Sequence, residues 1–419
     1  MNAAAFTLIF LFLFALSLAL KFWLDARQMQ HVRANRDQVP AQFAEKIGLA
    51  AHQKAADYTI AKTRLGIVDE IVGSALTLIL TLGGGLAWIY AIASGLADQP
   101  LLRDLAMLIG YVLVAGLVGL PLSIYGTFVV EARFGFNKMT WKLWLADMAK
   151  GLALGALLGL PLAALVLWLM QSAGSLWWLY AWLAWSAFQL LMLVLYPTFI
   201  APLFNKFTPL EDGTVKSRIE ALLVRCGFQS NGLFVMDGSK RSSHGNAYFT
   251  GFGSAKRIVF FDTLLKSLEP GEVEAVLAHE LGHFKRRHII KRIVWTFAAS
   301  LLFLWILSVM MTQSWFYGGL GVPLAPGVSS NGLALLLFAI VVPLITFPLS
   351  PLFSAYSRKH EFEADAYAAA QASAGDLAHS LVKMYEDNAS TLTPDPLHSA
   401  FYDSHPPAAA RIARLQTAG

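Results

Sequence analysis

The chain has 419 residues, of which 56% are hydrophobic and only 14% are charged, and its formal net charge is +5. Soluble domains carry about 25% charged residues, so this composition excludes an ordinary soluble enzyme and indicates an integral membrane protein. The small positive charge fits lysines and arginines that flank membrane spans, and without a nucleic-acid-binding motif we expect no nucleic-acid partner. The single cysteine, Cys226, excludes an intrachain disulfide and a cysteine-rich metal site.

Seven stretches are apolar enough to cross the lipid bilayer as helices, which takes roughly 20 residues each. They are residues 5–24, 71–94, 104–125, 149–170, 176–196, 293–312 and 333–353. No Lys or Arg precedes the first stretch, which favours a retained membrane helix over a cleaved signal peptide. The last stretch contains several prolines, so we expect a kinked or broken helix there.

The distribution of Lys and Arg predicts the orientation of the chain in the membrane. Residues 21–64 hold eight of them and residues 126–148 hold three, whereas residues 171–175 and 313–332 carry no charge. Positive residues stay on the cytoplasmic side of a membrane. We therefore expect the N-terminus outside and the C-terminus in the cytoplasm.

This topology divides the chain into four parts. They are transmembrane helices 1–5 with their cytoplasmic loops (1–196), a cytoplasmic segment (197–292), transmembrane helices 6–7 (293–353) and a C-terminal cytoplasmic helical segment (354–419). In the second part, "NAYFTGFG" (246–253) and "RIVFFD" (257–262) predict a short antiparallel strand pair. The stretch "TVKSRIEALLVRCG" (214–227) predicts an amphipathic helix that ends at Gly227.

The stretch "AVLAHELGHFKRRHIIKR" (275–292) contains a candidate metal site. His279, Glu280 and His283 follow the pattern H-E-x-x-H, which needs a helix to place both imidazoles on one face, with the glutamate beside them able to face a metal-bound water. Pro270 and the helix-forming "VEAVLAHEL" support that helix. The alternative is a surface helix with two unrelated histidines, and this pattern alone does not decide between them.

Catalytic zinc takes three protein ligands and a water, so a third ligand must be sought elsewhere. His288 is one position short of the extended zinc pattern and would point off the ligand face of a continuous helix. In "SRKHEFEADAYA", Glu361 can bind a metal while Asp365, four residues on, can orient a ligand histidine. Glu363 points away from that face and is expected to be solvated or to pair with Lys359. Spacing alone leaves open that Glu361 is an exposed helix carboxylate.

The basic residues that follow His283 are interpreted as anchors at the membrane surface. They are Lys285, Arg286, Arg287, Lys291 and Arg292. About ten residues, or roughly 15 Å of helix, separate His283 from the sixth span. We therefore expect the metal-site helix to run into that span as one rod, which places the metal close to the bilayer.

These motifs, together with others, resemble the type I CAAX prenyl protease family of membrane-embedded zinc metalloendopeptidases. The matching segments are "EARFGFNKMT" (131–140), "PTFIAPLFNKFTPL" (197–210), "SKRSSHGNAYFTGFG" (239–253), "AVLAHELGHFKRRH" (275–288), "SRKHEFEADAYA" (357–368) and "SHPPAAARI" (404–412). They run in order over most of the chain, which makes the combination far more specific than H-E-x-x-H alone.

The resemblance implies an all-α polytopic membrane protein in which about seven transmembrane helices enclose a water-filled chamber. A small α+β zincin-like cytoplasmic domain would complete the fold. The resemblance also implies Zn²⁺ bound by His279, His283 and Glu361, with Glu280 as the general base and Asp365 in support of a ligand.

Further roles follow from the same resemblance. His405 would stabilise the oxyanion, and Arg411 would support that site or a cytoplasmic substrate end. Asn246 and Ala247 would lie on a strand that pairs with the substrate backbone. The sequence around them, taken without the resemblance, would instead place His405 in a plain turn before the last helix and Asn246 in a turn.

The resemblance implies a zinc-dependent endopeptidase that cuts near the cytoplasmic membrane face, as in removal of the C-terminal tripeptide from prenylated proteins. Its substrate would be a peptide or protein, lipidated or membrane-associated. Short loops and a bias to Ala and Leu indicate a bacterial member, in the inner membrane. Two alternatives stay open: a membrane-protein quality-control metalloprotease, and an inactive seven-span transporter or scaffold. Charged residues are scarce at mid-membrane, which disfavours the transporter.

Overall fold

The structure is a computed structural model that describes residues 1–250, 257–324 and 330–418. Within these ranges, six helical segments are long and apolar enough to cross a membrane, and one bent helix pair would make a seventh. The six are Ala3–Ala34, Pro100–Glu131, Trp141–Ser172, Gly174–Phe204, His288–Met310 and Asn331–Gln371. Each covers one of the predicted spans to within two residues, which confirms six of the seven.

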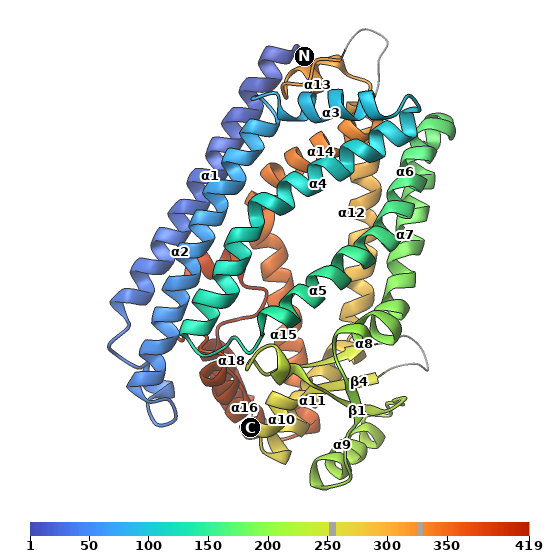
Figure 1. The fold of residues 1–419 in the computed structure, drawn as a ribbon. Helices are drawn as coiled ribbons and strands as arrows, with labels where there is room; N and C mark the ends of the chain where they lie inside the picture. Colours follow the sequence, from blue (N-terminus) through green and yellow to red (C-terminus); the bar gives the residue numbers. More distant parts are fainter. Residues whose placement is uncertain (251–256, 325–329, 419) are drawn as a thin grey trace.

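Figure 1 labels the helices that make up these segments. They are α1 (Ala3–Ala34), α4 (Pro100–Tyr125), α5 (Trp141–Leu154), α6 (Leu160–Ser172), α7 (Trp177–Leu195), α8 (Ala201–Phe204), α12 (His288–Met310), α14 (Asn331–Thr346) and α15 (Ser350–Gln371). The π-helical stretches Gly126–Glu131, Gly155–Gly159 and Tyr196–Ile200 extend or join them. Pro161 and Pro197 lie just after or within two of these stretches, where wider turns accommodate a residue that donates no backbone hydrogen bond.

The second predicted span, residues 71–94, is not one straight helix. α2 (Leu49–Leu80) and α3 (Gly85–Leu96) form a pair whose axis bends by 58° at a short break. Gly84 in the break has φ +80°, and a Cβ on Gly83 would lie 2.7 Å from the Ile79 carbonyl oxygen. Hydropathy does not register the break, because glycine keeps a stretch apolar while it ends a helix. Figure 1 shows α3 turned across the long axis of α2 near the N-terminus.

The seventh predicted span is broken where its prolines cluster, as expected. α14 contains Pro343 and gives way to a 3₁₀ turn, Phe347–Leu349, before α15 begins at Ser350. α15 then continues beyond the predicted end of the span to Gln371. The helix that leaves the membrane is therefore the same one that carries the carboxylates of "SRKHEFEADAYA".

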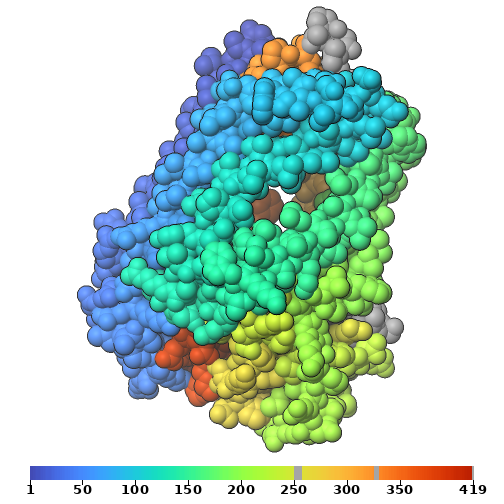
Figure 2. Space-filling model, viewed as in Figure 1, coloured from blue at the N-terminus to red at the C-terminus, as the bar shows by residue number. Residues whose placement is uncertain are grey.

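The membrane helices form a wall about one helix thick. In five of the six segments, at most 17% of the most apolar 18-residue stretch is buried inside the protein. In Pro100–Glu131 the buried share of that stretch is 6%. A closely packed bundle would bury the inner face of each helix, so these helices are open on two sides. Figure 2 shows the molecule hollowed between α4 and α5, with orange-brown atoms of the last third of the chain behind. This agrees with the expected helices around a chamber.

A hydrophobic core closes the N-terminal end of this wall. Phe10 of α1, Leu86 of α3 and Leu333 of α14 belong to one buried cluster. Phe316 of the short helix α13 (Ser314–Gly318) lies in the same cluster. Between membrane helices such contacts stabilise through close van der Waals packing, because lipid is as apolar as these side chains. The helices that enclose the hollow are thus fixed to one another at this end.

At the opposite end lies a compact unit of helices around a small sheet (Figure 1). Its strands are β1 (Phe207–Pro209), β2 (Leu233–Met236), β3 (Ala247–Thr250) and β4 (Arg257–Phe261), in the order β1-β2-β4-β3. Its helices are α9 (Thr214–Arg225), α10 (Asp262–Ser267), α11 (Pro270–Lys285), α16 (Ala374–Asp387), α17 (Pro396–Tyr402) and α18 (Ala408–Ala418).

Two predicted elements of this unit are confirmed. β3 and β4 pair in antiparallel fashion, from Ala247 opposite Phe260 onwards. The part of the predicted strand pair at residues 251–256 lies outside the described residues. α9 ends at Arg225, and Gly227 follows with φ 62°, the left-handed conformation that glycine favours after a helix.

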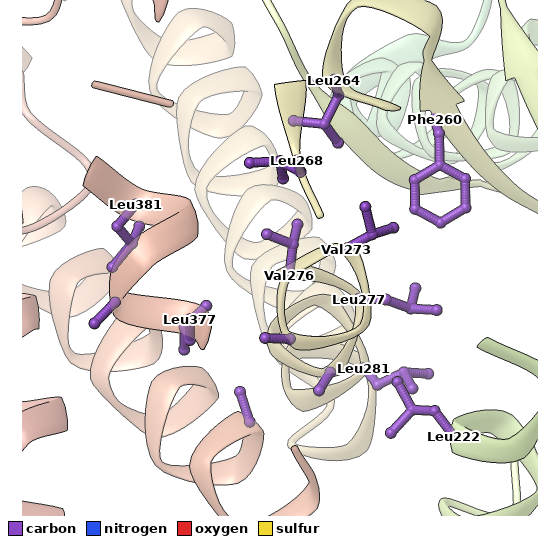
Figure 3. Close-up of a cluster of buried hydrophobic side chains, with 14 of the residues drawn as sticks. Leu222, Phe260, Leu264, Leu268, Val273, Val276, Leu277, Leu281, Leu377 and Leu381 are labelled. Carbon is purple, nitrogen blue, oxygen red and sulfur yellow. The ribbon is translucent and has the colours of Figure 1, made fainter. Parts of the chain in front are cut away.

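One hydrophobic core unites residues of 197–292 with residues of 354–419. Figure 3 shows the α11 side chains Val273, Val276, Leu277 and Leu281 between Leu222 and Phe260 on one side and Leu377 and Leu381 on the other. Because packed interiors deform little, a helix held from both sides gives its functional side chains little freedom to move. α11 is therefore a rigid support for a site.

Candidate metal centre

The candidate metal centre lies on α11, and the sequence specifies where this helix starts. Pro270 occupies the first turn. Glu269 and Glu272 form a reciprocal capping box, in which the Glu269 N–H donates to Glu272 Oε2 at 2.8 Å. The box satisfies N–H groups that a helix start otherwise leaves without partners. The helix runs on to Lys285 and carries the complete H-E-x-x-H pattern, as predicted.

Side chains from α11 and α15 converge at one point. His279 Nε2 lies 3.2 Å from His283 Nε2 and 3.4 Å from Glu361 Oε2. His283 Nε2 lies 3.3 Å from Glu361 Oε1. The three candidate ligand atoms are all within 4.8 Å of one another, a grouping that no other His, Cys, Asp and Glu side chains in the described ranges form.

A buried carboxylate holds His279 from behind. His279 Nδ1 lies 2.8 Å from Asp365 Oδ1, so its N–H donates to that oxygen. Burial alone would lower the pKa of His279, but Asp365 and then Glu361 outweigh it and raise that pKa above its usual value. Asp365 thus leaves the Nε2 lone pair of His279 directed toward the other candidate ligands.

Arg411 of α18 completes this contact. It donates to Asp365 from Nε at 2.9 Å and from Nη2 at 2.6 Å, and its Nη1 lies 3.9 Å from Glu361 Oε2. Burial opposes its charge, yet Asp365 raises the pKa of Arg411 above its usual value. Arg411 is only 6% exposed, so its position favours support of Asp365 over contact with a substrate end.

Two other predicted site residues lie beside the ligand group. His405 Nε2 is 3.5 Å from Glu361 Oε1, and its Nδ1 is 3.0 Å from Ser404 Oγ. The His405 side chain is 64% exposed, so its ring can contact a bound molecule. Glu280, next to His279 on α11, is half-buried. His405 is accessible beside the candidate ligands, as an oxyanion donor requires, and the partial exposure of Glu280 is compatible with a general base.

Asn246 and Ala247 lie at the free edge of the sheet. β3 pairs only with β4 among the described strands, and it lies against α11. Phe261 N–H donates to the Asn246 carbonyl at 2.9 Å, so Ala247, next in the antiparallel alternation, directs its own N–H and C=O to the free edge. The Asn246 side chain accepts a hydrogen bond from that N–H at 2.8 Å.

The prediction of a single rod from the metal site into the sixth span is wrong. α11 ends at Lys285 and α12 begins at His288. Arg287 between them has φ 56°, a left-handed conformation that is uncommon outside glycine and that interrupts the helix. The expectation rested on a continuous helix, and "FKRRH" contains no glycine or proline to indicate an interruption.

The break between α11 and α12 changes the expected positions of two side chains, those of His288 and Glu363. His288 is only 3% exposed, and its Nδ1 lies 3.0 Å from His283 Nδ1. Glu363, expected to be solvated or paired with Lys359, instead lies 3.0 Å from His288 Nε2. His288 is thus no member of the converging ligand group, as predicted, but it contacts one of the candidate ligands from behind.

Gly282 allows α11 and α15 to approach closely. A Cβ at this position would lie 2.9 Å from Ala364 Cα, 3.0 Å from the Ala364 carbonyl oxygen and 3.2 Å from Tyr367 Cβ. The obstacles are mostly backbone atoms, which cannot turn aside as a side chain can. The glycine within H-E-x-x-H thus brings Glu361 within reach of the two histidines.

We expect Gly282→Ala to separate the two helices and weaken metal binding by about tenfold or more, the size of effect seen when ligand support is lost. Overpacking of this kind should also cost about 1–3 kcal/mol of stability. Gly151→Ala on α5 is the matched control, because nothing lies within 4 Å of its added Cβ. The measurement is competition with a metal chelator, and equal affinities in both variants would contradict the role of Gly282.

The donor set fits a metal ion. Two imidazoles and one carboxylate are a ligand set of catalytic zinc sites, which leave a fourth position open. Glu361 Oε2 is buried and makes no hydrogen bond with any residue that the structure describes. A buried carboxylate oxygen that makes no hydrogen bond is costly, even with His279 Nε2 at 3.4 Å and Arg411 Nη1 at 3.9 Å. A cation between the three side chains would satisfy it.

Comparisons with known proteins agree with this geometry. A family model described as "CAAX prenyl protease N-terminal, five membrane helices" matches residues 28–206, and one described as "Peptidase family M48" matches residues 209–418. The chain is 35% identical over 408 residues to the CAAX prenyl protease 1 homolog of Oryza sativa, covering 94% of each protein. It is also 35% identical to CAAX prenyl protease 1 of Saccharomyces cerevisiae, covering 92% of this chain and 90% of that protein.

A solved structure is similar over the whole fold. The crystal structure of S. mikatae Ste24p aligns with a TM-score of 0.92 at 34% identity, covering 99% of this chain and 100% of that chain. The class is therefore a multi-pass membrane protease. The chain belongs to peptidase family M48, among the CAAX prenyl proteases, which confirms the resemblance drawn from the motifs.

Proposed function

We propose that the chain is a zinc-dependent endopeptidase that hydrolyses peptide bonds in lipidated proteins at the cytoplasmic face of the membrane. The observation that carries the proposal is the set of three donor atoms, from His279, His283 and Glu361, within 4.8 Å of one another. These residues would hold Zn²⁺. When bound there, the ion supplies Lewis acidity that activates water and polarises a carbonyl.

In this proposal each protein group has one role. Glu280 accepts a proton from the attacking water and delivers it to the leaving amine, which contributes about 10²–10⁴-fold to the rate. His405 donates a hydrogen bond to the developing oxyanion, worth about 2.7–4 kcal/mol for one donor. Asp365 keeps the proton of His279 on Nδ1, so that Nε2 is available as a ligand, and Arg411 holds Asp365 in place.

The free edge of β3 suits an extended peptide. A substrate strand could take the Ala247 N–H that the Asn246 side chain occupies, and it would lie along α11 beside the candidate ligands. The relatives named CAAX prenyl protease 1 support a substrate with a prenylated C-terminal CAAX sequence. We propose that the chain removes the C-terminal tripeptide from such proteins.

We expect Ala247→Pro to raise the KM for peptide substrate about fivefold, since one lost backbone hydrogen bond is worth about 1 kcal/mol. Proline removes the N–H at the free edge but not the β3–β4 bond at Asn246, and edge strands tolerate it. Ala247→Ser keeps the N–H and is the control. Steady-state kinetics with thermal unfolding tests this, and an unchanged KM in the proline variant would remove Ala247 from the substrate strand.

We propose that the protein lies in a bacterial inner membrane with its N-terminus outside. In Figure 1 the N-terminus lies at one end of the molecule, and the C-terminus and the helices of the site lie at the other. The Lys- and Arg-rich segment 21–64 includes the turn from α1 to α2, at the same end as the site. Labelling of single cysteines by an impermeant reagent, from either side of oriented vesicles, tests this orientation.

The deciding experiment compares a prenylated CAAX peptide with the same peptide lacking the lipid, using the purified full chain. We expect about one zinc per chain, faster cleavage of the prenylated peptide and loss of cleavage after chelation. Cleavage that survives complete metal removal would overturn the metallopeptidase mechanism. Equal rates on the two peptides would overturn the lipidated substrate class and favour a broader quality-control role. Absence of cleavage would favour the inactive scaffold.

A further inference from the structure

The two candidate histidine ligands are supported from behind in different ways. His279 Nδ1 lies 2.8 Å from the Asp365 carboxylate. His283 Nδ1 lies 3.0 Å from another imidazole nitrogen, Nδ1 of His288. The other nitrogen of His288, Nε2, lies 3.0 Å from Glu363 Oε2. A carboxylate therefore stands behind each ligand histidine, directly in one case and through a second imidazole in the other.

The hydrogen-bond directions along this second path follow from what each group can donate. If His283 binds a metal through Nε2, its proton is on Nδ1 and must be donated outward. His288 Nδ1 is then the acceptor, which places the proton of His288 on Nε2, and Glu363 accepts from it. Every donor in the path has an acceptor, and the last acceptor is a carboxylate.

The ring of His288 is itself held in place. It stacks on His360 at 3.9 Å with 11° between the ring planes, and Tyr356 packs edge-on against His360 at 4.3 Å. The left-handed Arg287 delivers His288 to this position at the start of α12. A buried ring with both nitrogens engaged and one face covered cannot turn freely. An ordinary helix start needs none of these contacts.

We propose that His288 and Glu363 act as positioning residues that fix the ring orientation of His283 and the nitrogen with which it binds the metal. The inference rests on the proposed metal site. We call the path from His283 through His288 to Glu363 the relay. Together with Asp365, which contacts His279, the relay orients both histidine ligands before the ion binds. Groups that orient metal ligands typically account for 10–100-fold in metal affinity.

Three variants test the relay in the purified full chain. His288→Phe keeps a ring that can stack on His360 but removes both nitrogens. Glu363→Leu removes the terminal acceptor at a position that is 32% exposed, where folding should tolerate the change. Glu363→Gln restores an acceptor oxygen. His360→Phe is the matched control. It keeps an aromatic ring that can stack on His288, and it leaves the contacts of His288 with His283 and Glu363 in place.

The readouts are the dissociation constant for Zn²⁺, from chelator competition, and the visible absorption spectrum of the Co²⁺-substituted protein. We expect His288→Phe to weaken zinc binding about 10–100-fold and to alter the cobalt spectrum. Glu363→Leu should weaken binding in the same direction and by less, and Glu363→Gln should restore it. His360→Phe should match the wild type in both readouts.

Wild-type affinity and an unchanged cobalt spectrum in His288→Phe would overturn the proposal. If His288→Phe does not fold, the comparison of Glu363→Leu with Glu363→Gln decides, and equal affinities in those two variants would overturn it. Equal losses in His360→Phe and His288→Phe would also overturn it, since packing alone would then explain the effect. A wild-type chain that binds no zinc would refute the proposed function itself, which is a distinct result.

Discussion

Glu280→Gln should abolish peptide cleavage while metal binding persists. Glutamine has nearly the same size and shape as glutamate but cannot accept a proton from water, so the general-base step is lost. We expect kcat to fall about 10²–10⁴-fold. Zinc content should stay at the wild-type level, because the three candidate ligands do not include Glu280. The measurements are peptide cleavage and metal content on the same preparation.

The control for this variant is Glu220→Gln, at an exposed position on α9. It should keep wild-type kcat and wild-type zinc content. A Glu280→Gln protein that retains more than about a tenth of the wild-type kcat would show that another group serves as the base. Loss of zinc together with activity would instead place Glu280 among the residues that hold the ion.

Arg411→Met should destabilise the protein strongly. The substitution leaves Asp365 buried with His279 as its remaining donor, because Arg411 supplies two of the contacts to that carboxylate. Removal of one partner from a buried ion pair costs about 3–5 kcal/mol, chiefly because the other charge stays buried and unpaired. We expect a clearly lower unfolding midpoint in the metal-free protein, and weaker zinc binding because Asp365 no longer holds His279 firmly.

Two comparisons isolate the cause of this loss. Arg414→Met removes a cation on the same helix that stacks at 4.3 Å over Phe362 and lies at the surface, so it should cost within about 1 kcal/mol. The double variant Arg411→Met with Asp365→Leu should recover part of the stability, since the carboxylate that lost its main cation is then also removed. A double variant less stable than Arg411→Met alone would contradict the unpaired-charge explanation.

Helix geometry predicts which candidate side chains share a face on each helix, whereas their meeting at one metal site was left open by spacing and implied by the family resemblance. H-E-x-x-H places both histidines on one face of α11, and the four-residue spacing of Glu361 and Asp365 does the same on α15. One carboxylate can then meet the imidazoles while the other lies behind one of them, as the structure shows. The partner of Asp365 on α18, Arg411, came only from the family resemblance, because no local spacing connects the two.

The contacts of His288 and Glu363 could not be predicted, because they depend on a helix break after His283 that the residues there do not indicate. The local sequence does not indicate the helix break at Arg287, since arginine has no preference for positive φ. The break before α3 was different. Three consecutive glycines at 83–85 were available as a signal, but the apolarity of the stretch masked them.

Hydropathy also could not predict the hollow between the membrane helices, or the hydrophobic core that residues of 197–292 share with residues of 354–419. Hydropathy identifies helices that can cross a bilayer but does not show whether their inner faces meet. The low buried fractions of the spans became apparent only from the arrangement of the helices. Likewise, Leu222 and Leu377 belong to segments separated by two membrane spans, and only the fold brings them to opposite sides of α11.

The most direct test of the central claim is an anomalous diffraction experiment at the zinc absorption edge on crystals of the full chain. We expect one strong peak at about 2.0–2.2 Å from His279 Nε2, His283 Nε2 and a Glu361 carboxylate oxygen. A peak coordinated without Glu361, or the absence of a peak between α11 and α15 in zinc-loaded protein, would contradict it.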